Sequence, residues 1–216
     1  MAHNIDHIDC IIFDLGGVIL NIDPFRTVEQ MQQLGIRNFE AVYAHLKQNQ
    51  TLNDLERGLI SQRTFLDRIK SDSGVDLSDE QVLRAWNALL LDFPRERIAL
   101  LKRLKETARF RTFLLSNTNA IHYQVYTRML QDHHSVQGLE ELFDKAYFSH
   151  QLHMRKPDAE IYEYVLKDAR MDPRRTLFID DALANIEAAR KLGISGYHLT
   201  DGASITDLFP EHLIAR

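Results

Sequence analysis

The sequence has few of the features that mark secreted, nucleic-acid-binding or membrane proteins. Its one cysteine, Cys10, cannot form an internal disulfide, which is typical of a reducing compartment. The formal net charge of -5 provides no basic surface for nucleic acid. No apolar run approaches the roughly 20 residues of a membrane span, and residues 1–9 contain no long apolar segment. We therefore expect a cytoplasmic protein without nucleic-acid or membrane partners.

The composition itself is that of an ordinary globular protein. Hydrophobic residues make up 44% of the 216 residues and charged residues 26%, which suffices for a packed core. This length predicts one core domain with a smaller appendage. Cys10 lies within the apolar run that leads to Asp14, so we interpret it as a packing residue rather than a reactive thiol.

Five short apolar runs alternate with amphipathic stretches of helical length. The runs are Ile8 to Asp14, Phe110 to Ser116, Lys145 to Ser149, Thr176 to Asp181 and Gly196 to Thr200. The clearest helical stretches are Arg95–Lys105, Ala159–Ala169 and Ala182–Leu192. This alternation predicts an α/β fold with a doubly wound parallel sheet, and the continuous apolar runs predict strands buried on both faces.

The spacing of the runs is uneven in one place, after the first strand. Residues 23–92 have a helical pattern throughout, including a capping box that starts at Ser78. Pro24 and Pro94 mark the two crossings of the chain into and out of this segment. We predict a core domain of residues 1–22 and 93–216 with an inserted helical cap of residues 23–92. The alternative is one continuous domain with a long helical excursion.

Polar residues end the first two runs, where a parallel sheet binds ligands. Asp14 is followed by Gly16 and Gly17, which allow a sharp turn and a close approach to a ligand. Ser116 and Asn117 offer a hydroxyl, an amide and free backbone N–H groups at a helix start, which suits a phosphate. Taken alone, each of these motifs is equally well explained as a turn or a helix cap.

Charged residues stand at two further strand ends. Lys156 precedes Pro157, at which we expect a helix to start. A cation at a helix N-terminus is electrostatically unfavourable. The lysine is therefore either a surface residue without a specific role or a residue that binds an anion. Asp180 and Asp181 follow the fourth run, and adjacent carboxylates repel each other unless a cation lies between them. Their oxygens predict a hard divalent metal, Mg²⁺.

The order of these motifs resembles the haloacid dehalogenase superfamily of hydrolases. The motifs are Asp14-x-x-Gly17, Ser116-Asn117-Thr118, Lys156-Pro157 and Asp180-Asp181-x-x-x-Asn185, and the resemblance runs from about Cys10 to Leu199. Within the superfamily the chain is most similar to bacterial α-D-glucose-1-phosphate phosphatases and to the phosphatase domain of soluble epoxide hydrolases. The resemblance implies a Rossmann-like core with a helical cap. It also implies a Mg²⁺-dependent phosphatase of a small phosphate monoester such as glucose 1-phosphate. The oligomeric state stays open between a monomer and a small homo-oligomer.

The resemblance assigns the phosphate chemistry to four residues. Asp14 is the nucleophile, which forms an aspartyl-phosphate that water hydrolyses. Lys156 neutralises charge on the nucleophile and the phosphate. Ser116 and the backbone of Asn117 hold the phosphoryl oxygens.

The resemblance likewise assigns the metal ligands. Asp14, Asp181 and the carbonyl oxygen of Gly16 bind Mg²⁺ directly, and Asp180 binds it through a water. Asn185, which we expect on the same helix face as Asp181, orients these ligands.

Gly16 departs from the usual pattern of the superfamily. Most of its phosphatases have an aspartate here that protonates the leaving group, and such acid–base catalysis is worth about 10² to 10⁴ in rate. We favour a substrate with a weakly basic leaving group, such as an anomeric sugar oxygen. A 2-haloacid dehalogenase and a catalytically weak scaffold protein stay open as alternatives. Asp23 and His122 are candidate replacement acids, although a helix cap and an exposed helix residue are the stronger interpretations of them.

Overall fold

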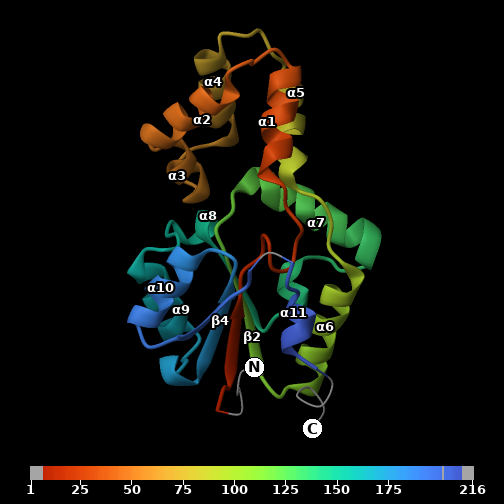
Figure 1. Cartoon of the computed structure of the whole chain (residues 1–216), viewed down its shortest axis with the longest axis vertical. Helices are drawn as coiled ribbons and strands as arrows, with labels where there is room; N and C mark the ends of the chain where they lie inside the picture. Colours follow the sequence, from red (N-terminus) through yellow and green to blue (C-terminus); the bar gives the residue numbers. More distant parts are fainter. Residues whose placement is uncertain (1–6, 201, 211–216) are drawn as a thin grey trace.

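The protein is described by a computed structural model that covers residues 7–200 and 202–210. The molecule is elongated, with a group of helices at one end and a sheet flanked by helices at the other (Figure 1). No helix in this described part of the chain is both long and apolar enough to cross a membrane.

The sheet has five parallel strands in the order β3-β2-β1-β4-β5. Its strands are β1 (Cys10–Phe13), β2 (Arg111–Ser116), β3 (Lys145–Phe148), β4 (Thr176–Asp180) and β5 (Ser195–His198). The predicted parallel α/β sheet is confirmed, and the first strand lies at its centre. The expectation that every strand is buried on both faces is wrong for β5, whose four residues are all half-buried because it forms an edge of the sheet.

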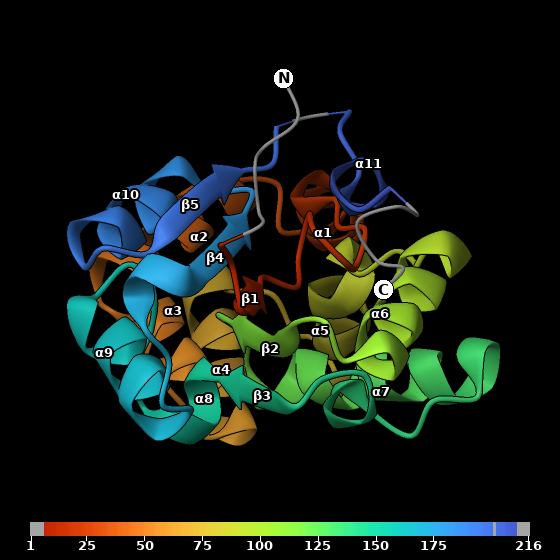
Figure 2. The same cartoon turned by 90° about the horizontal axis from the view of Figure 1, so that it is seen from below.

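Helices cover both faces of the sheet, as Figure 2 shows. One face packs against α6 (Arg95–Thr107), α7 (Ala120–His134) and α11 (Ile205–Leu208), and the other against α9 (Ala159–Asp168) and α10 (Leu183–Lys191). Side chains of β1 alternate between the two cores: Ile11 and Phe13 enter the first, and Cys10 and Ile12 the second. Cys10 is buried there, which agrees with a packing role.

The chain between β1 and α6 forms a separate group of helices, which we name the helical unit (residues 24–89). It comprises α1 (Pro24–Gln33), α2 (Phe39–Gln48), α3 (Thr51–Glu56), α4 (Gln62–Ser73), α5 (Asp79–Trp86) and the short 3₁₀ helix η1 (Asn87–Leu89). The predicted capping box at Ser78 is present. The unit has its own apolar core, to which Ile121 of α7 also contributes. The assignment of residues 23–92 as a cap domain stays a prediction.

The two segments that connect the helical unit to the sheet run side by side. The N–H of Asn21 donates to the carbonyl of Asp92 at 2.9 Å, and that of Leu91 donates to the carbonyl of Asn21 at 3.0 Å. Ile22 and Leu90 form an antiparallel bridge between them. The insertion therefore closes on itself before the chain returns to the sheet at α6.

A second contact joins α3 to the loop around α8 (Ser149–Leu152). Arg57 pairs with Asp158, and Arg155 lies 3.0 Å from a carboxylate oxygen of Glu56. Gly58 has a left-handed φ of 66°, and a Cβ at this position would overlap the carbonyl of His150. This close approach holds one side of the helical unit against the core.

Candidate active site

The sheet topology brings three of the predicted strand ends to one place. Asp14 directly follows β1, Ser116 ends β2 and Asp180 ends β4. Because β1 lies between β2 and β4, Phe13 pairs with both Leu114 and Ile179. The side chains that follow these positions thus meet at the carboxyl edge of the sheet, as predicted for a parallel sheet.

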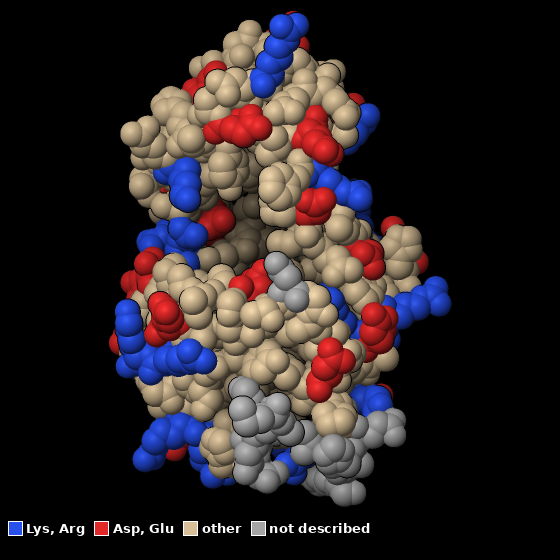
Figure 3. Space-filling view, viewed as in Figure 1, with Lys and Arg blue, Asp and Glu red and all other residues tan. Residues whose placement is uncertain are grey.

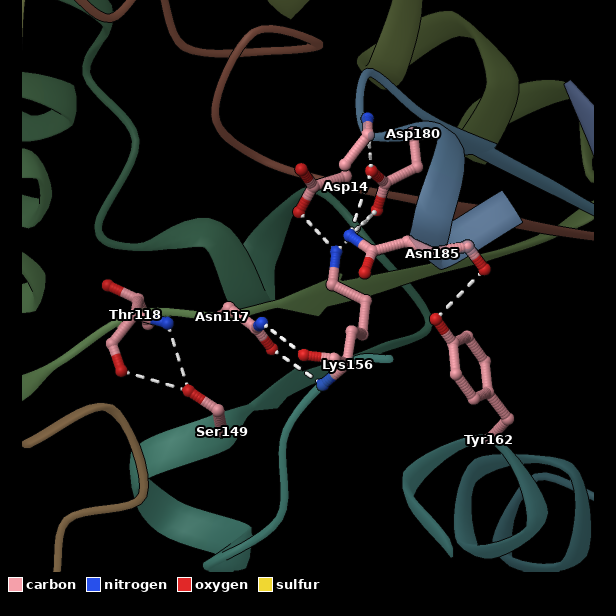
Figure 4. A network of polar contacts seen from close by, with 9 residues as sticks. Asp14, Asn117, Thr118, Ser149, Lys156, Tyr162, Asp180 and Asn185 are labelled. Carbon is pink, nitrogen blue, oxygen red and sulfur yellow. Dashed lines mark hydrogen bonds and ion pairs between the residues drawn. The ribbon is translucent and has the colours of Figure 1, made fainter. Parts of the chain in front are cut away.

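Lys156 lies between two of these carboxylates. Its Nζ is 2.7 Å from Oδ1 of Asp14 and 2.6 Å from Oδ2 of Asp180 (Figure 4). The lysine side chain is only 1% exposed, and that of Asp180 is fully buried. Breaking a buried ion pair by removing one partner is strongly destabilising, so these three groups fix one another in position.

Burial and charge act in opposite directions on these groups. Burial raises the pKa of the Asp14 carboxyl, and the positive charge of Lys156 partly offsets this. Burial also disfavours the ammonium of Lys156, but the negative charges of Asp14 and Asp180 hold its pKa above the ordinary value. A carboxylate and an ammonium therefore face each other in a dry environment.

Asp180 accepts hydrogen bonds at both of its oxygens. The backbone N–H of Ala182 donates to Oδ1 at 2.8 Å, and Nδ2 of Asn185 lies 3.0 Å from Oδ1 and 3.1 Å from Oδ2. With Lys156 these contacts use the roughly four lone-pair positions of a carboxylate. The expectation that Asn185 shares a helix face with Asp181 is wrong, because α10 begins only at Leu183 and Asn185 contacts Asp180 instead.

Asp14, Asp180 and Asp181 form a cluster that suits a metal ion. One oxygen of each lies within 4.8 Å of the others. Asp181 is exposed, so its carboxylate is available, whereas that of Asp180 is already engaged. Gly17 has a φ of 72°, and a Cβ there would overlap the Asp181 carboxylate. These donors fit Mg²⁺ bound directly by Asp14 and Asp181, with Asp180 acting indirectly.

Three more predicted residues surround this cluster. Gly16 lies in the loop directly after Asp14, where it bridges to Leu20. Ser116 is buried at the end of β2. The side chain of Asn117 holds the backbone of Lys156 by two bonds of 2.9 Å, one to its carbonyl and one from its N–H (Figure 4). Sequence reasoning missed this contact, because it joins residues that are far apart along the chain.

The expected helix start at Pro157 is also wrong. Helix α9 begins at Ala159, with Asp158 as its N-cap residue. Lys156 therefore stands in the loop before the helix, and its position is explained by its two carboxylate partners rather than by a helix terminus.

Ser149 is a site residue that sequence reasoning missed. It directly follows β3 and is fully buried. Its hydroxyl accepts a hydrogen bond from the N–H of Thr118 at 2.9 Å and lies 2.7 Å from the carbonyl of Glu56 in the helical unit. The sequence pattern could have identified it, since Ser149 is the polar residue that ends the third predicted strand.

The two candidate replacement acids have different outcomes. Asp23 caps α1 by accepting a hydrogen bond from the N–H of Phe25 at 3.1 Å, as expected. The interpretation of His122 as an exposed residue is wrong: it is buried and stacks on Trp86 with ring centroids 5.4 Å apart. Burial lowers the pKa of His122 to about 3, so the ring is neutral near pH 7 and lacks the acidic proton of an imidazolium.

Comparison with known proteins identifies the family to which this chain belongs. The family model described as haloacid dehalogenase-like hydrolase matches residues 8–193. The chain belongs to the haloacid dehalogenase-like hydrolases. This confirms the predicted family, and the described topology confirms the predicted fold.

Relatives of this hydrolase include phosphatases that match over nearly their whole length. A D-ribitol-5-phosphate phosphatase from Bacteroides thetaiotaomicron is 30% identical over 195 residues, which cover 89% of this chain and 92% of the relative. A sesquiterpene phosphatase from Aspergillus oryzae is 29% identical over 194 residues, covering 88% and 89%. The predicted enzyme class, a phosphoric monoester hydrolase of this family, is confirmed by these relatives.

A solved structure of the family gives the same result. A family enzyme from Bacteroides thetaiotaomicron, in complex with magnesium and inorganic phosphate, has a TM-score of 0.84 and 35% identity. The match covers 94% of this hydrolase and 100% of that chain. The predicted cofactor, Mg²⁺, agrees with both this relative and the acidic cluster described above.

Proposed function

We propose that this hydrolase is a Mg²⁺-dependent phosphatase that hydrolyses a small phosphate monoester through an aspartyl-phosphate on Asp14. The observation that carries the proposal is the contact of the buried Lys156 ammonium with both Asp14 and Asp180, at 2.7 and 2.6 Å. A carboxylate that points to the carboxyl edge of the sheet, with a fixed cation beside it, is a suitable nucleophile for phosphorus.

The proposed reaction has two steps at phosphorus. An oxygen of Asp14 attacks the phosphorus atom, and the bond to the alcohol oxygen breaks as the aspartyl-phosphate bond forms. The alcohol oxygen leaves with the bonding electron pair and takes a proton from water. Water then attacks the same phosphorus, which releases inorganic phosphate and restores the Asp14 carboxylate. In both steps Lys156 neutralises charge on the phosphoryl group, and Ser116 with the backbone of Asn117 binds its remaining oxygens.

Mg²⁺ bound by Asp14, Asp181 and the carbonyl of Gly16 would reduce the repulsion between the carboxylate and the phosphate. In this proposal Asp180 does not bind the metal directly. It orients Lys156 and Asn185 through the hydrogen bonds that occupy its oxygens.

The helical unit is proposed to act as the cap, residues 23–92, and to contact the alcohol part of the substrate. Glucose 1-phosphate stays the sequence-based prediction. The Bacteroides relative, named for ribitol 5-phosphate, supports a sugar or polyol phosphate, whereas the Aspergillus relative, named for a sesquiterpene, supports an apolar alcohol. We further propose a cytoplasmic monomer or small homo-oligomer with no nucleic-acid or membrane partner, in keeping with the net charge of -5.

The test compares Asp14→Asn with Asp67→Asn, a matched change at an ion-paired surface aspartate of α4. We expect Asp14→Asn to abolish phosphate release and Asp67→Asn to retain it, because an amide cannot form the covalent intermediate. Chelation of divalent cations should silence the unmodified enzyme, and Mg²⁺ should restore it. Halide release from a 2-haloacid in excess chelator would instead support a dehalogenase, and inactivity under all conditions a scaffold protein.

A further inference from the structure

A cavity of about 340 Å³ lies between the helical unit and the core. The surface is visibly hollowed at this level of the molecule (Figure 3). The core side of the cavity is formed by Asn117, Thr118 and Asn119, which directly follow Ser116 at the end of β2. A group bound in the cavity is therefore contiguous with the proposed phosphate position.

The walls that the helical unit contributes are mainly apolar. Its large aliphatic and aromatic lining residues include Phe25, Val28, Phe39, Leu52, Leu55 and Trp86, and Tyr43 adds an aromatic ring with a hydroxyl. Binding pockets of this size take their affinity from such side chains and their specificity from a few polar groups. The polar groups at this cavity therefore decide which alcohol can be bound.

Most of these polar side chains already have partners within the protein. The hydroxyl of Thr27 donates to the carbonyl of Trp86 at 3.2 Å. The amide of Asn117 is engaged on both sides by the backbone of Lys156. The side-chain oxygen of Asn119 accepts two backbone N–H groups at the start of α7. Each of these three side chains therefore already has a partner within the protein.

Three titratable groups line the cavity: Tyr43, Glu56 and His122. Glu56 forms an ion pair with Arg155 at 3.0 Å, and Nδ1 of His122 lies 2.9 Å from Oδ1 of Asn87. Burial raises the pKa of Glu56 and lowers that of His122, as expected for groups removed from water. A polyol placed here would exchange its hydration for a wall that is mainly apolar, which costs free energy for each hydroxyl left unpaired.

Phe25 adds an exposed aromatic side chain to the lining of the cavity. It stands on the first turn of α1, lines the cavity and is 78% exposed. An aromatic side chain so exposed gains by contact with an apolar ligand, because that contact removes its surface from water.

We propose that the alcohol part of the substrate is an apolar alkyl or aryl group that fills this cavity, rather than a polyol. This inference rests on the proposed phosphatase function and names the substrate class of the same site. An aryl group satisfies a second requirement, since its oxygen is a weakly basic leaving group that needs little help where Gly16 replaces an acid.

The test measures kcat/KM of the Mg²⁺-loaded enzyme on methyl, n-butyl, n-pentyl and n-hexyl phosphate, with erythritol 4-phosphate and ribitol 5-phosphate as the polyol counterparts of the butyl and pentyl esters. The longer alkyl groups differ little in leaving-group basicity, so the dependence on length reports burial. We expect kcat/KM to rise about fourfold for each added methylene until the cavity is filled. The polyol phosphates should be poorer substrates than the alkyl phosphates of equal length.

A pair of variants locates this effect. Phe25→Ala should reduce the hexyl-to-methyl ratio of kcat/KM about fivefold, because it removes an aromatic contact from the cavity. Tyr164→Ala truncates another exposed aromatic residue, on α9 and outside the cavity, and should retain the ratio. An unchanged ratio in Phe25→Ala, no dependence on chain length, or faster turnover of the polyol phosphates would overturn the inference.

Acetyl phosphate separates this inference from the proposed function. It is an activated substrate too small to extend through the cavity. Its Asp14-dependent hydrolysis, combined with a preference for polyols, would reject the apolar substrate and leave the phosphatase intact. Failure to hydrolyse acetyl phosphate and every ester would reject the phosphatase, and the inference with it.

Discussion

The strand-end cluster and the cavity beside it are stabilised in opposite ways. In the cluster, Lys156 is buried between Asp14 and Asp180, and each charge is held by another. In the cavity, the titratable His122 is kept neutral by burial and stacks on Trp86. Directional charge pairs allow little substitution, whereas apolar walls tolerate changes in shape. If the cavity binds the alcohol as proposed, the same phosphate chemistry can be combined with different alcohols by changes in the helical unit.

The largest effect should follow removal of the cation from the cluster. Lys156→Met leaves two buried carboxylates without their partner, so we expect a loss of about 3–5 kcal/mol in the free energy of unfolding. Lys145→Met is the matched control. Its ion pair with Asp168 is half-exposed, and the loss there should be about 0–1 kcal/mol. Urea unfolding in excess chelator measures both, and equal losses would mean that the cluster is no more strongly coupled than a surface pair.

A smaller effect should follow a change beside the acidic cluster that leaves its charges in place. Gly17→Ala pushes a methyl group into the Asp181 carboxylate, so the Mg²⁺ concentration for half-maximal activity should rise about 10- to 100-fold. Gly74→Ala introduces similar backbone strain, since Gly74 has a φ of 64° with nothing near its Cβ position. Titration of activity with Mg²⁺ should therefore separate the two variants. A matching Mg²⁺ requirement in both would count against Asp181 as a ligand.

The smallest effect concerns the cavity and is a pH dependence. The unfolded chain binds a proton at His122 near the ordinary pKa of 6.5, whereas burial lowers the folded-state pKa to about 3. Above pH 6.5 the residue is neutral in both states, and protonation does not reduce the free energy of unfolding. As the pH drops from 6.5 toward 3, only the unfolded chain takes up the proton, so the free energy of unfolding falls. Between about pH 7 and about pH 5.5 the loss is about 1.2 kcal/mol.

Chemical denaturation at these two pH values tests the expectation. His122→Gln should lose less stability on acidification than the unmodified chain, by about this amount. His133→Gln changes an exposed histidine of the same helix and should keep the original pH dependence. If both variants respond to acid as the unmodified chain does, His122 is not held neutral in the folded state.

The sequence predicted those parts of the molecule that depend on local signals. Asp14, Ser116 and Asp180 each end an apolar run, and parallel pairing alone suffices to bring such ends together. The capping residues Ser78 and Asp23 were likewise predictable, because their partners lie within three residues.

Contacts between distant segments could not be predicted in the same way. The bonds from Asn117 to the backbone of Lys156 join residues 39 positions apart, and no periodic pattern reports them. His122 looks like a surface residue of α7 until the helical unit places Trp86 against it. The apolar cavity has the same origin, since its walls come from several helices of the unit and its floor from the core.

The paired segments at the base of the helical unit have a consequence for how such chains can vary in length. Asn21 is bonded to both Leu91 and Asp92, so the two ends of the insertion are fixed beside each other whatever lies between them. Doubling the length of a loop whose ends are already joined costs only about 0.6 kcal/mol in closure entropy. Residues can therefore be gained or lost in the loops between the helices of this unit without a shift in the register of β1 against β2. Changes in the part proposed to select the alcohol therefore leave the sheet edge that carries Asp14 and Asp180 unchanged.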